Sequence, residues 1–273
     1  MSSHLAILAG NGSLPLQLSA AFPEALCVVF EGMPHQMGSD RPHCCQFEKL
    51  NSLFELLSRN NVKQVVMVGA MSRPKLDPAE LDPFMQNIAK DFMQVLQKGD
   101  DKVLRYVIGL FEEKGFEVVA PQDLCPDLTL PSGFRSGDLS ALSAGDLSFA
   151  DDILRHMSPL DIGQAVVVEH GHVLGVETLQ GTAALLEFVQ RTAPHLRMSQ
   201  GGLLVKRPKT GQDMRVDVPT IGPETIHQVV NAGLSGIVVS PNKVIVLERE
   251  KTLSLAKHLG ILLWAQELSL IHI

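Results

Sequence analysis

The segment from Lys206 to Asp217 mixes basic and acidic side chains, and it ends within the motif RVDVPTIGP, residues 215–223. Two unit charges about 4 Å apart interact by about 4 kcal/mol at an effective dielectric near 20, so an acid beside a phosphate needs a cation between them. Alternatively, such an acid orients a water molecule as a base. The pattern therefore favours hydrolysis of a phosphoanhydride, with Asp217 as the catalytic or metal-binding acid.

The other charged residues of this segment receive roles from the same reasoning. Asp213 is a second candidate metal ligand. Neutralising the negative charge on the equatorial phosphate oxygens is most of what phosphoryl-type transfer requires, and the candidates for this role are Lys206, Lys209 and Arg215. The two glycines and three prolines of residues 208–223 indicate specific turns. A solvated loop of mixed charge is the alternative interpretation.

Glycine-containing turns follow two expected strands in the first half of the chain. AGNGSLP places four candidate substrate-binding residues between a strand and a helix: Gly10, Asn11, Gly12 and Ser13. VGAMSRP places four more after a buried strand: Gly69, Met71, Ser72 and Arg73. Glycine lets backbone N–H groups approach an anion, and a guanidinium can hold a phosphate. Because Pro15 replaces the third glycine of GxGxxG, a tight turn and a solvated arginine are the alternatives.

Polar residues also stand at two further junctions. In QKGDDK, Asp100 and Asp101 begin an expected helix, where one carboxylate caps the positive terminus and leaves the other for a ribose hydroxyl or a metal. Gln122 follows the expected strand FEVVAP, and an ordinary loop residue is the alternative. Ligands bind beyond the carboxyl ends of the strands in open parallel sheets, so these loops together favour a nucleotide-sized ligand.

Glu177 in GVETLQGT is a further candidate metal ligand, and Thr178 beside it is a candidate substrate-binding residue. The alternative is that Thr178 caps the following helix and Glu177 lies on the surface. The motif EHGH, residues 169–172, is typical of the surface of a hairpin turn. The histidines show no paired metal-binding spacing, so no histidine is a candidate ligand.

These candidates depend on an alternation of strands and helices in the first half. Strand patterns at 4–10, 25–32, 62–71 and 116–121 alternate with helix patterns at 12–22, 47–61, 78–99 and 101–115. The alternation predicts a Rossmann-like domain whose parallel sheet is covered on both faces. One apolar stripe at helical spacing is expected in the core, with a greasy substrate groove as the alternative: Phe84, Met85, Ile88, Phe92 and Leu96.

The second half predicts a mixed α/β catalytic domain. AVVVEHGHVLGVET predicts an antiparallel hairpin around His170 and Gly171, and another turn between strands is expected at Pro241 and Asn242. Pro223 is typical of the first residue of a helix. The expected boundaries are a first domain at 1–130, a linker or hinge at 131–138, a second domain at 139–268 and a tail at 269–273.

The composition is that of a compact folded protein, with 273 residues, 45% hydrophobic and 19% charged. A net charge of −7 argues against general affinity for nucleic acid. The four cysteines form no CxxC pair and are expected as reduced thiols in a cytosolic protein. We expect neither a membrane span nor a signal peptide, because no run of 18 apolar residues and no basic N-terminal region is present.

The stretches that carry a family resemblance are LAILAGNGSLP, VGAMSRP, KGDDKVLR, DLTLP, DIGQAVVV…VLGVET…GT and LLVKRPKTGQDMRVDVPTIGP. In this order they resemble the UDP-2,3-diacylglucosamine pyrophosphatases of the LpxI type. The resemblance covers about residues 4–266, and RVDVPTIGP is its most specific element. It implies a Rossmann-like N-terminal domain and a distinct α/β C-terminal domain, with the lipid nucleotide held between them.

The resemblance also implies the reaction, which converts UDP-2,3-diacylglucosamine to 2,3-diacylglucosamine 1-phosphate and UMP in lipid A synthesis, with Mg²⁺. Asp217 matches the essential acid of the family's D-[LV]-P-T-I-G block, with Val218 in place of the common Leu. A cytoplasmic homodimer at the inner membrane is implied as well. Because the chain is acidic, we expect weak membrane contact through the lipid itself. A non-catalytic lipid-nucleotide carrier and an NAD-dependent oxidoreductase are the other hypotheses.

Overall fold

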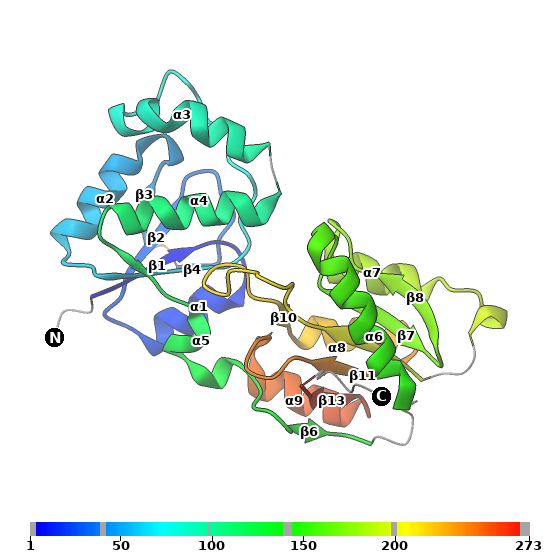
Figure 1. Ribbon diagram of the computed structural model, residues 1–273. Helices are drawn as coiled ribbons and strands as arrows, with labels where there is room; N and C mark the ends of the chain where they lie inside the picture. The colour runs from blue at the N-terminus through cyan, green and yellow to red at the C-terminus, as the bar shows by residue number, and fades with distance from the viewer. Residues whose placement is uncertain (1–3, 39–41, 98, 139–143, 198–200, 268–273) are drawn as a thin grey trace. The chain divides into compact units, whose positions relative to one another are not determined.

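The computed structural model describes residues 4–38, 42–97, 99–138, 144–197 and 201–267, and it has the predicted mixed α/β fold (Figure 1). The chain forms two compact units. The N-terminal unit comprises Met1–Cys125 together with Asp213–Asp217, and the C-terminal unit comprises Pro126–Gln212 together with Val218–Ile273. The sequence pattern had placed the segment Asp213–Asp217 in the second domain, whereas the contacts group it with the first unit.

The N-terminal unit is built on a parallel sheet of order β3-β2-β1-β4-β5. Its strands are β1 (Leu5–Ala9), β2 (Leu26–Phe30), β3 (His43–Cys45), β4 (Gln64–Val68) and β5 (Glu117–Val118). Every residue of β1 is buried, because a parallel strand is covered on both faces. The polar edge strand β3 has no strand pattern in the sequence and was not predicted.

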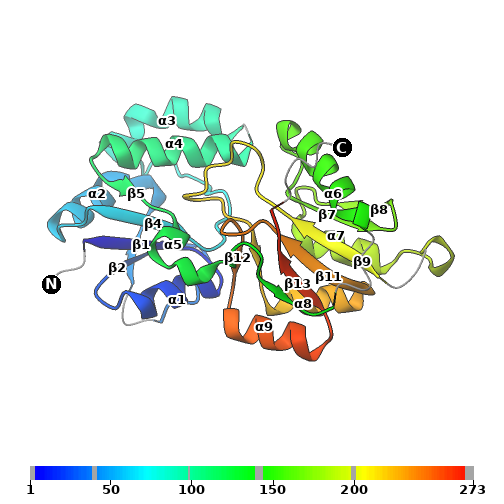
Figure 2. The ribbon, with the colours of Figure 1, turned by 60° about the horizontal axis from the view of Figure 1, so that its bottom comes forward.

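Helices cover both faces of this sheet. They are α1 (Ser13–Ala21), α2 (Leu50–Arg59), which follows the 3-10 turn η1 (Phe47–Lys49), α3 (Pro83–Leu96), α4 (Asp100–Glu113) and α5 (Pro121–Leu124). Helices α2, α3 and α4 lie on one face and α1 and α5 on the other (Figures 1 and 2). The predicted apolar stripe of α3 is confirmed, since Met85 and Phe92 are buried in the core and Phe84, Ile88 and Leu96 pack against it.

The C-terminal unit is built on a mixed sheet of order β6-β13-β11-β9-β7-β8. Its strands are β6 (Arg135–Ser136), β7 (Ala165–Glu169), β8 (His172–Val176), β9 (Gly202–Lys206), β11 (Leu234–Val239) and β13 (Leu262–Ala265). The three central strands are parallel, whereas β7 pairs antiparallel with β9 and β8, and β6 pairs antiparallel with β13. The predicted hairpin is confirmed, and its turn residues His170 and Gly171 have φ of 46° and 78°.

Successive residues of β7 face opposite sides of this sheet. Val167 packs in the cluster that holds α7 (Gly181–Gln190), α8 (Pro223–Asn231) and α9 (Arg249–His258), whereas Val166 and Val168 pack against α6 (Ala144–Met157). The 3-10 turns are η2 (Pro126–Leu128), η3 (Ser158–Leu160) and η4 (Pro194–Leu196). Helix α8 begins at Pro223 as predicted. None of the helices in the described ranges is both long and apolar enough to cross a membrane.

Two expectations about the second half need correction or detail. The turn expected at Pro241 and Asn242 is present, but the strand that follows it, β12 (Ile245–Val246), leaves the main sheet and pairs in parallel with β10 (Thr220–Ile221). The expected linker at 131–138 contains β6, which is part of the C-terminal sheet. Residues 139–143 and the expected tail at 269–273 lie outside the described residues.

Candidate functional site

The two glycine turns of the N-terminal unit lie against each other. The backbone N–H of Asn11 donates to the carbonyl of Ala70 at 2.8 Å, and the N–H of Ala70 donates back to Asn11 at 2.8 Å. A Cβ at Gly10 would lie 2.5 Å from the Ala70 carbonyl oxygen, and one at Gly69, whose φ is 90°, would lie 2.7 Å from the Gly10 carbonyl carbon. Only glycine permits this approach, so the structure brings together the two turns that the sequence singled out.

Helix α1 begins directly after the first of these turns. Its N-cap residue is Gly12, with φ of 112°, and no side chain among the described residues caps its N-terminus. The first turn carries no acidic residue. The hydroxyl of Ser13 accepts a hydrogen bond from Gln17, and the Asn11 side chain accepts one from the Gly12 N–H. The positive end of a helix dipole with uncapped N–H groups is a suitable place for an anion such as a phosphate.

The second turn continues into residues that contact neighbouring elements. The guanidinium of Arg73 donates to the carbonyl of Leu96 at 2.8 Å, at the C-terminus of α3. The hydroxyl of Ser72 lies 3.3 Å from the sulfur of Met33, and Met71 is partly exposed. Arg73 therefore satisfies a helix-end carbonyl, an arrangement that favours the helix dipole.

The segment Asp213–Asp217 is attached to the N-terminal unit at several points. The side-chain amide of Gln122 donates to the carbonyl of Met214 at 3.0 Å. Val216 packs against the core of that unit. The guanidinium of Arg215 lies 2.5 Å from the carboxylate of Glu112 on α4. These contacts join residues about a hundred positions apart in the chain. Glu112 was not predicted, because nothing in its local sequence pattern distinguishes it from other acidic residues on helix surfaces.

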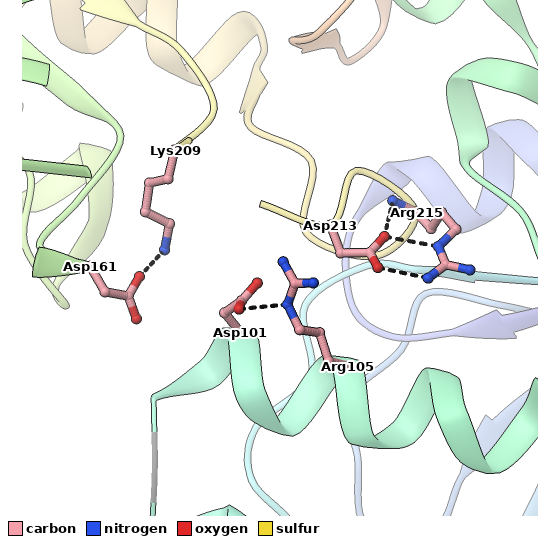
Figure 3. A network of polar contacts seen from close by, with 6 residues as sticks. All are labelled: Asp101, Arg105, Asp161, Lys209, Asp213 and Arg215. Carbon is pink, nitrogen blue, oxygen red and sulfur yellow. Dashed lines mark hydrogen bonds and ion pairs between the residues drawn. The ribbon is translucent and has the colours of Figure 1, made fainter. Parts of the chain in front are cut away.

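Asp213 and Arg215 form a two-pronged ion pair (Figure 3). The guanidinium Nε donates to Oδ1 at 2.9 Å and Nη2 donates to Oδ2 at 2.8 Å, so both carboxylate oxygens are engaged. The hydrogen bond from Arg215 is the main reason that the pKa of Asp213 lies below its usual value, and the same bond raises the pKa of Arg215. This engagement leaves Asp213 poorly suited to bind a metal ion.

Asp101 and Asp217 complete the set of predicted acids in this unit. Asp101 lies in the first turn of α4 and accepts a hydrogen bond from Arg105 at 2.8 Å, one turn along the helix (Figure 3). The pKa of Arg105 is raised mainly by this bond and, to a lesser degree, by the charge of Asp213. Asp217 is half-buried, and its backbone N–H donates to the Asp213 carbonyl at 3.2 Å, which closes the turn. Asp101, Asp213 and Asp217 thus belong to the same unit as the glycine turns.

Candidates of the C-terminal unit take part in a buried network. The Lys206 ammonium donates to the hydroxyl of Thr182 at 2.6 Å, and that hydroxyl donates to Glu177 Oε1 at 2.6 Å. The other oxygen of Glu177 accepts from the backbone N–H of Gln164 at 3.0 Å. Glu177 and Lys206 are only 5% and 4% exposed, so the interpretation of Glu177 as a surface residue is wrong. Thr182 was not singled out in the sequence.

The remaining candidates of this unit also have protein partners. Thr178 donates to the side chain of Gln180, which is the N-cap residue of α7, so Thr178 does not cap that helix as the alternative proposed. Lys209 pairs with Asp161 (Figure 3). The pair with Asp161, the residue that follows η3, holds the segment that precedes Asp213 within the C-terminal unit.

The EHGH motif is only partly on the surface. Glu169 is 1% exposed and pairs with the guanidinium of Arg197 at 3.0 Å, which also donates to the carbonyls of Ala232 and Gly233. Asp146 accepts the backbone N–H groups of the hairpin turn, at 2.8 Å from His170. The expectation of a surface motif is therefore wrong for Glu169, because the largely buried side chain of Arg197 compensates its charge.

The described residues do not form a metal site from protein groups alone. Within the part of the chain that the structure describes, no group of three or more His, Cys, Asp or Glu side chains is suited to hold a metal ion. Asp213 is bound by Arg215, and Glu177 by Thr182 and Gln164. Mg²⁺ is commonly held by one or two carboxylates and completed by substrate phosphates. Asp217 and a bound diphosphate would fit such a site.

Comparisons with known proteins identify the family. The model of the LpxI N-terminal domain matches residues 4–128, and the model of the LpxI C-terminal domain matches residues 134–264. A protein of Caulobacter vibrioides named UDP-2,3-diacylglucosamine pyrophosphatase LpxI is 34% identical to this chain over an alignment of 269 residues, and the alignment covers 94% of this chain and 95% of that protein. With both domain models matched and this identity along nearly the whole length, the chain belongs to the LpxI family.

Proposed function

We propose that this chain is a hydrolase that cleaves the pyrophosphate bond of UDP-2,3-diacylglucosamine, releasing UMP and 2,3-diacylglucosamine 1-phosphate in lipid A biosynthesis. The name of the Caulobacter vibrioides relative, UDP-2,3-diacylglucosamine pyrophosphatase, supports this choice of substrate. The observation that carries the proposal is the attachment of the Asp217 segment to the unit that holds the glycine turns and the uncapped start of α1. An acid and an anion-binding helix end are the parts that attack on a diphosphate requires.

The proposed mechanism divides the work between backbone and side chain. The N–H groups at the start of α1 bind a phosphate of the diphosphate and stabilise the charge that grows on its oxygens. Asp217 orients a water molecule and takes its proton as the water oxygen bonds to phosphorus. The bridging P–O bond breaks and UMP leaves. We place the attack at the phosphorus on the sugar side, so that hydrolysis in ¹⁸O-labelled water labels the lipid product and not UMP.

Asp217 is the residue on which the proposal depends most. Replacing it with Asn should lower the rate of UMP release by a factor on the order of 10³, which is within the range for loss of a general base. The unfolding temperature should stay close to that of the wild type, because the side chain is only half-buried. Asp123→Asn, in the exposed part of α5, is the matched control and should keep full turnover. Near-normal turnover of the Asp217 variant would rule out its assigned role.

We further propose that Mg²⁺ binds with the substrate, held by the Asp217 carboxylate and phosphate oxygens. When bound, the ion would neutralise phosphate charge. Calorimetry should then detect tight Mg²⁺ binding only when a nucleoside diphosphate is present, and Asp217→Ala should abolish that coupling. Equal Mg²⁺ binding with and without the diphosphate would contradict a site completed by substrate.

The membrane association and the oligomeric state are also proposals. We propose a cytoplasmic homodimer whose contact with the inner membrane is weak and made through the acyl chains of the substrate, since a chain of net charge −7 has little attraction for anionic lipids. Vesicles of anionic lipid should therefore retain the protein only when they contain the substrate. Light scattering on the purified protein should give twice the mass of 29.7 kDa, and a monomer would refute the dimer.

A further inference from the structure

Three different contacts hold the turn that ends in Asp217. The Met214 carbonyl accepts a hydrogen bond from Gln122 on α5, and Val216 packs on the apolar core. The third contact is the ion pair of Arg215 with Glu112 in the last turn of α4. Each anchor comes from the N-terminal unit, although the covalent neighbours of the segment on both sides belong to the other unit.

The guanidinium of Arg215 connects one of these anchors, Glu112, to the turn itself. Its Nε and Nη2 donate to the two oxygens of Asp213, whose carbonyl in turn accepts the backbone N–H of Asp217 at 3.2 Å. Its Nη1 donates to Glu112. All three guanidinium nitrogens therefore hold protein carboxylates, and the planar fork of an arginine fixes the direction of such bonds.

From this geometry we propose that Glu112 is a positioning residue, which acts through Arg215 and Asp213 to fix the turn that presents Asp217. Arg215 is then a link in this chain of contacts and does not bind the diphosphate. The inference rests on the proposed function, because it assigns to Asp217 the chemical step. It adds a residue of α4 that contacts neither the substrate nor the reacting atoms.

Steady-state kinetics separate this role from phosphate binding. Glu112→Gln should lower kcat about fivefold with little change in KM, as expected for loss of a partly exposed ion pair. Arg215→Met should lower kcat about 100-fold, the scale of a misplaced catalytic group. The double variant should be no worse than Arg215→Met, because both substitutions break one chain of contacts. Glu113→Gln removes the same charge from the next residue of α4 and should behave as the wild type.

Direct binding of the diphosphate by Arg215 gives the opposite pattern. Arg215→Met would then raise KM, and Glu112→Gln would leave kcat unchanged or raise it by releasing the guanidinium. Either result overturns the proposal. Glu112→Asp provides a further check, because it keeps the charge and should recover part of the kcat that Glu112→Gln loses.

Hydrogen–deuterium exchange tests the same contacts without any substrate. The peptide that contains residues 213–217 should exchange about fivefold faster in Glu112→Gln, and also in Gln122→Met, than in the wild type, while peptides of β1 and β4 should be unchanged. Unchanged exchange in 213–217 would overturn the proposal, as would faster exchange with a wild-type kcat. If the wild-type protein releases no UMP, the proposed function fails, and the exchange rates still decide whether Glu112 holds the segment.

Discussion

The two units of this protein bury different kinds of side chain. The N-terminal core is apolar and rich in phenylalanine, with Phe54 in contact with the rings of Phe84, Phe111 and Phe116. In the described ranges, the charged residues that are buried all belong to the C-terminal unit: Asp146, Asp151, Glu169, Glu177 and Lys206. Charged side chains near strand ends, such as Glu169, Glu177 and Lys206, are thus part of the buried structure of the C-terminal unit. In the N-terminal unit, backbone turns and the half-buried Asp217 form the candidate site.

The largest effect is expected from breaking a buried ion pair of the C-terminal unit. Arg197→Met leaves the Glu169 carboxylate buried without its cation, which should cost about 3–5 kcal/mol of unfolding free energy. Urea denaturation measures this directly. Arg191→Met removes an arginine from an exposed pair on the same unit and should change stability by less than about 1 kcal/mol. Similar small losses of unfolding free energy in both variants would show that the pair of Arg197 and Glu169 contributes little to the stability of this unit.

A smaller effect is expected where the N-terminal unit relies on glycine. Gly69→Ala puts a Cβ 2.7 Å from the backbone of Gly10 at a φ of 90°, which should cost about 2–3 kcal/mol. Gly109→Ala, in the open interior of α4, should instead stabilise the fold by about 1 kcal/mol. Thermal unfolding of both variants compares the same substitution at two different backbone conformations. An unchanged unfolding temperature for Gly69→Ala would mean that the turns can separate.

Removing a helix cap from the N-terminal unit should lower the unfolding free energy by about 1 kcal/mol. Asp82 caps α3 by accepting the Met85 N–H at 2.7 Å, and its other oxygen accepts the N–H of Asn51 in the first turn of α2 at 2.8 Å. Asp82→Ala removes both bonds and should lower the unfolding free energy by about that amount, whereas Glu80→Ala, in an exposed pair with Lys49, should have almost no effect. Chemical denaturation of the two variants provides the measurement.

The smallest effect, below about 1 kcal/mol, is expected for the partly exposed pair of Asp213 and Arg215. Because Arg215 holds the pKa of Asp213 below its usual value, the ionised carboxylate stabilises the folded state at pH values above the usual pKa. This contribution is lost as the pH falls through the lowered pKa. The stability difference between the wild type and Asp213→Asn should therefore be largest at neutral pH and shrink in acid. Denaturation at several pH values tests this, and a difference that grows in acid would contradict it.

The sequence predicted the features that depend on local pattern. Continuous apolar runs such as that of β4 indicated buried parallel strands, and His170 with Gly171 indicated the hairpin. The pairing of β12 with β10 was missed because each strand has only two residues, too few for any periodicity. The docking of Asp213–Asp217 depends on partners such as Glu112, 103 positions away, which no local pattern encodes.

Buried charges explain the other differences between prediction and structure. The burial of Lys206, Glu169 and Glu177 was not predicted, because charged side chains are rarely buried unless they are paired. The pairing depends on Thr182 and Arg197, whose position beside them follows only from the completed sheet. In the N-terminal unit, in contrast, the turns at Gly10 and Gly69 were predicted, because a turn that requires glycine can be recognised from the residues of the turn itself.

The attachment of Asp213–Asp217 also limits how this protein can be divided or recombined. The chain passes from one unit to the other after Cys125, after Gln212 and after Asp217, so no single cut separates two complete units. A fragment that ends at Cys125 lacks the apolar cover that Val216 provides to its core. A recombination event that exchanged the whole N-terminal unit would therefore have to include the five residues Asp213–Asp217, which lie in the C-terminal half of the sequence. A single crossover cannot exchange Asp217 together with the rest of its unit.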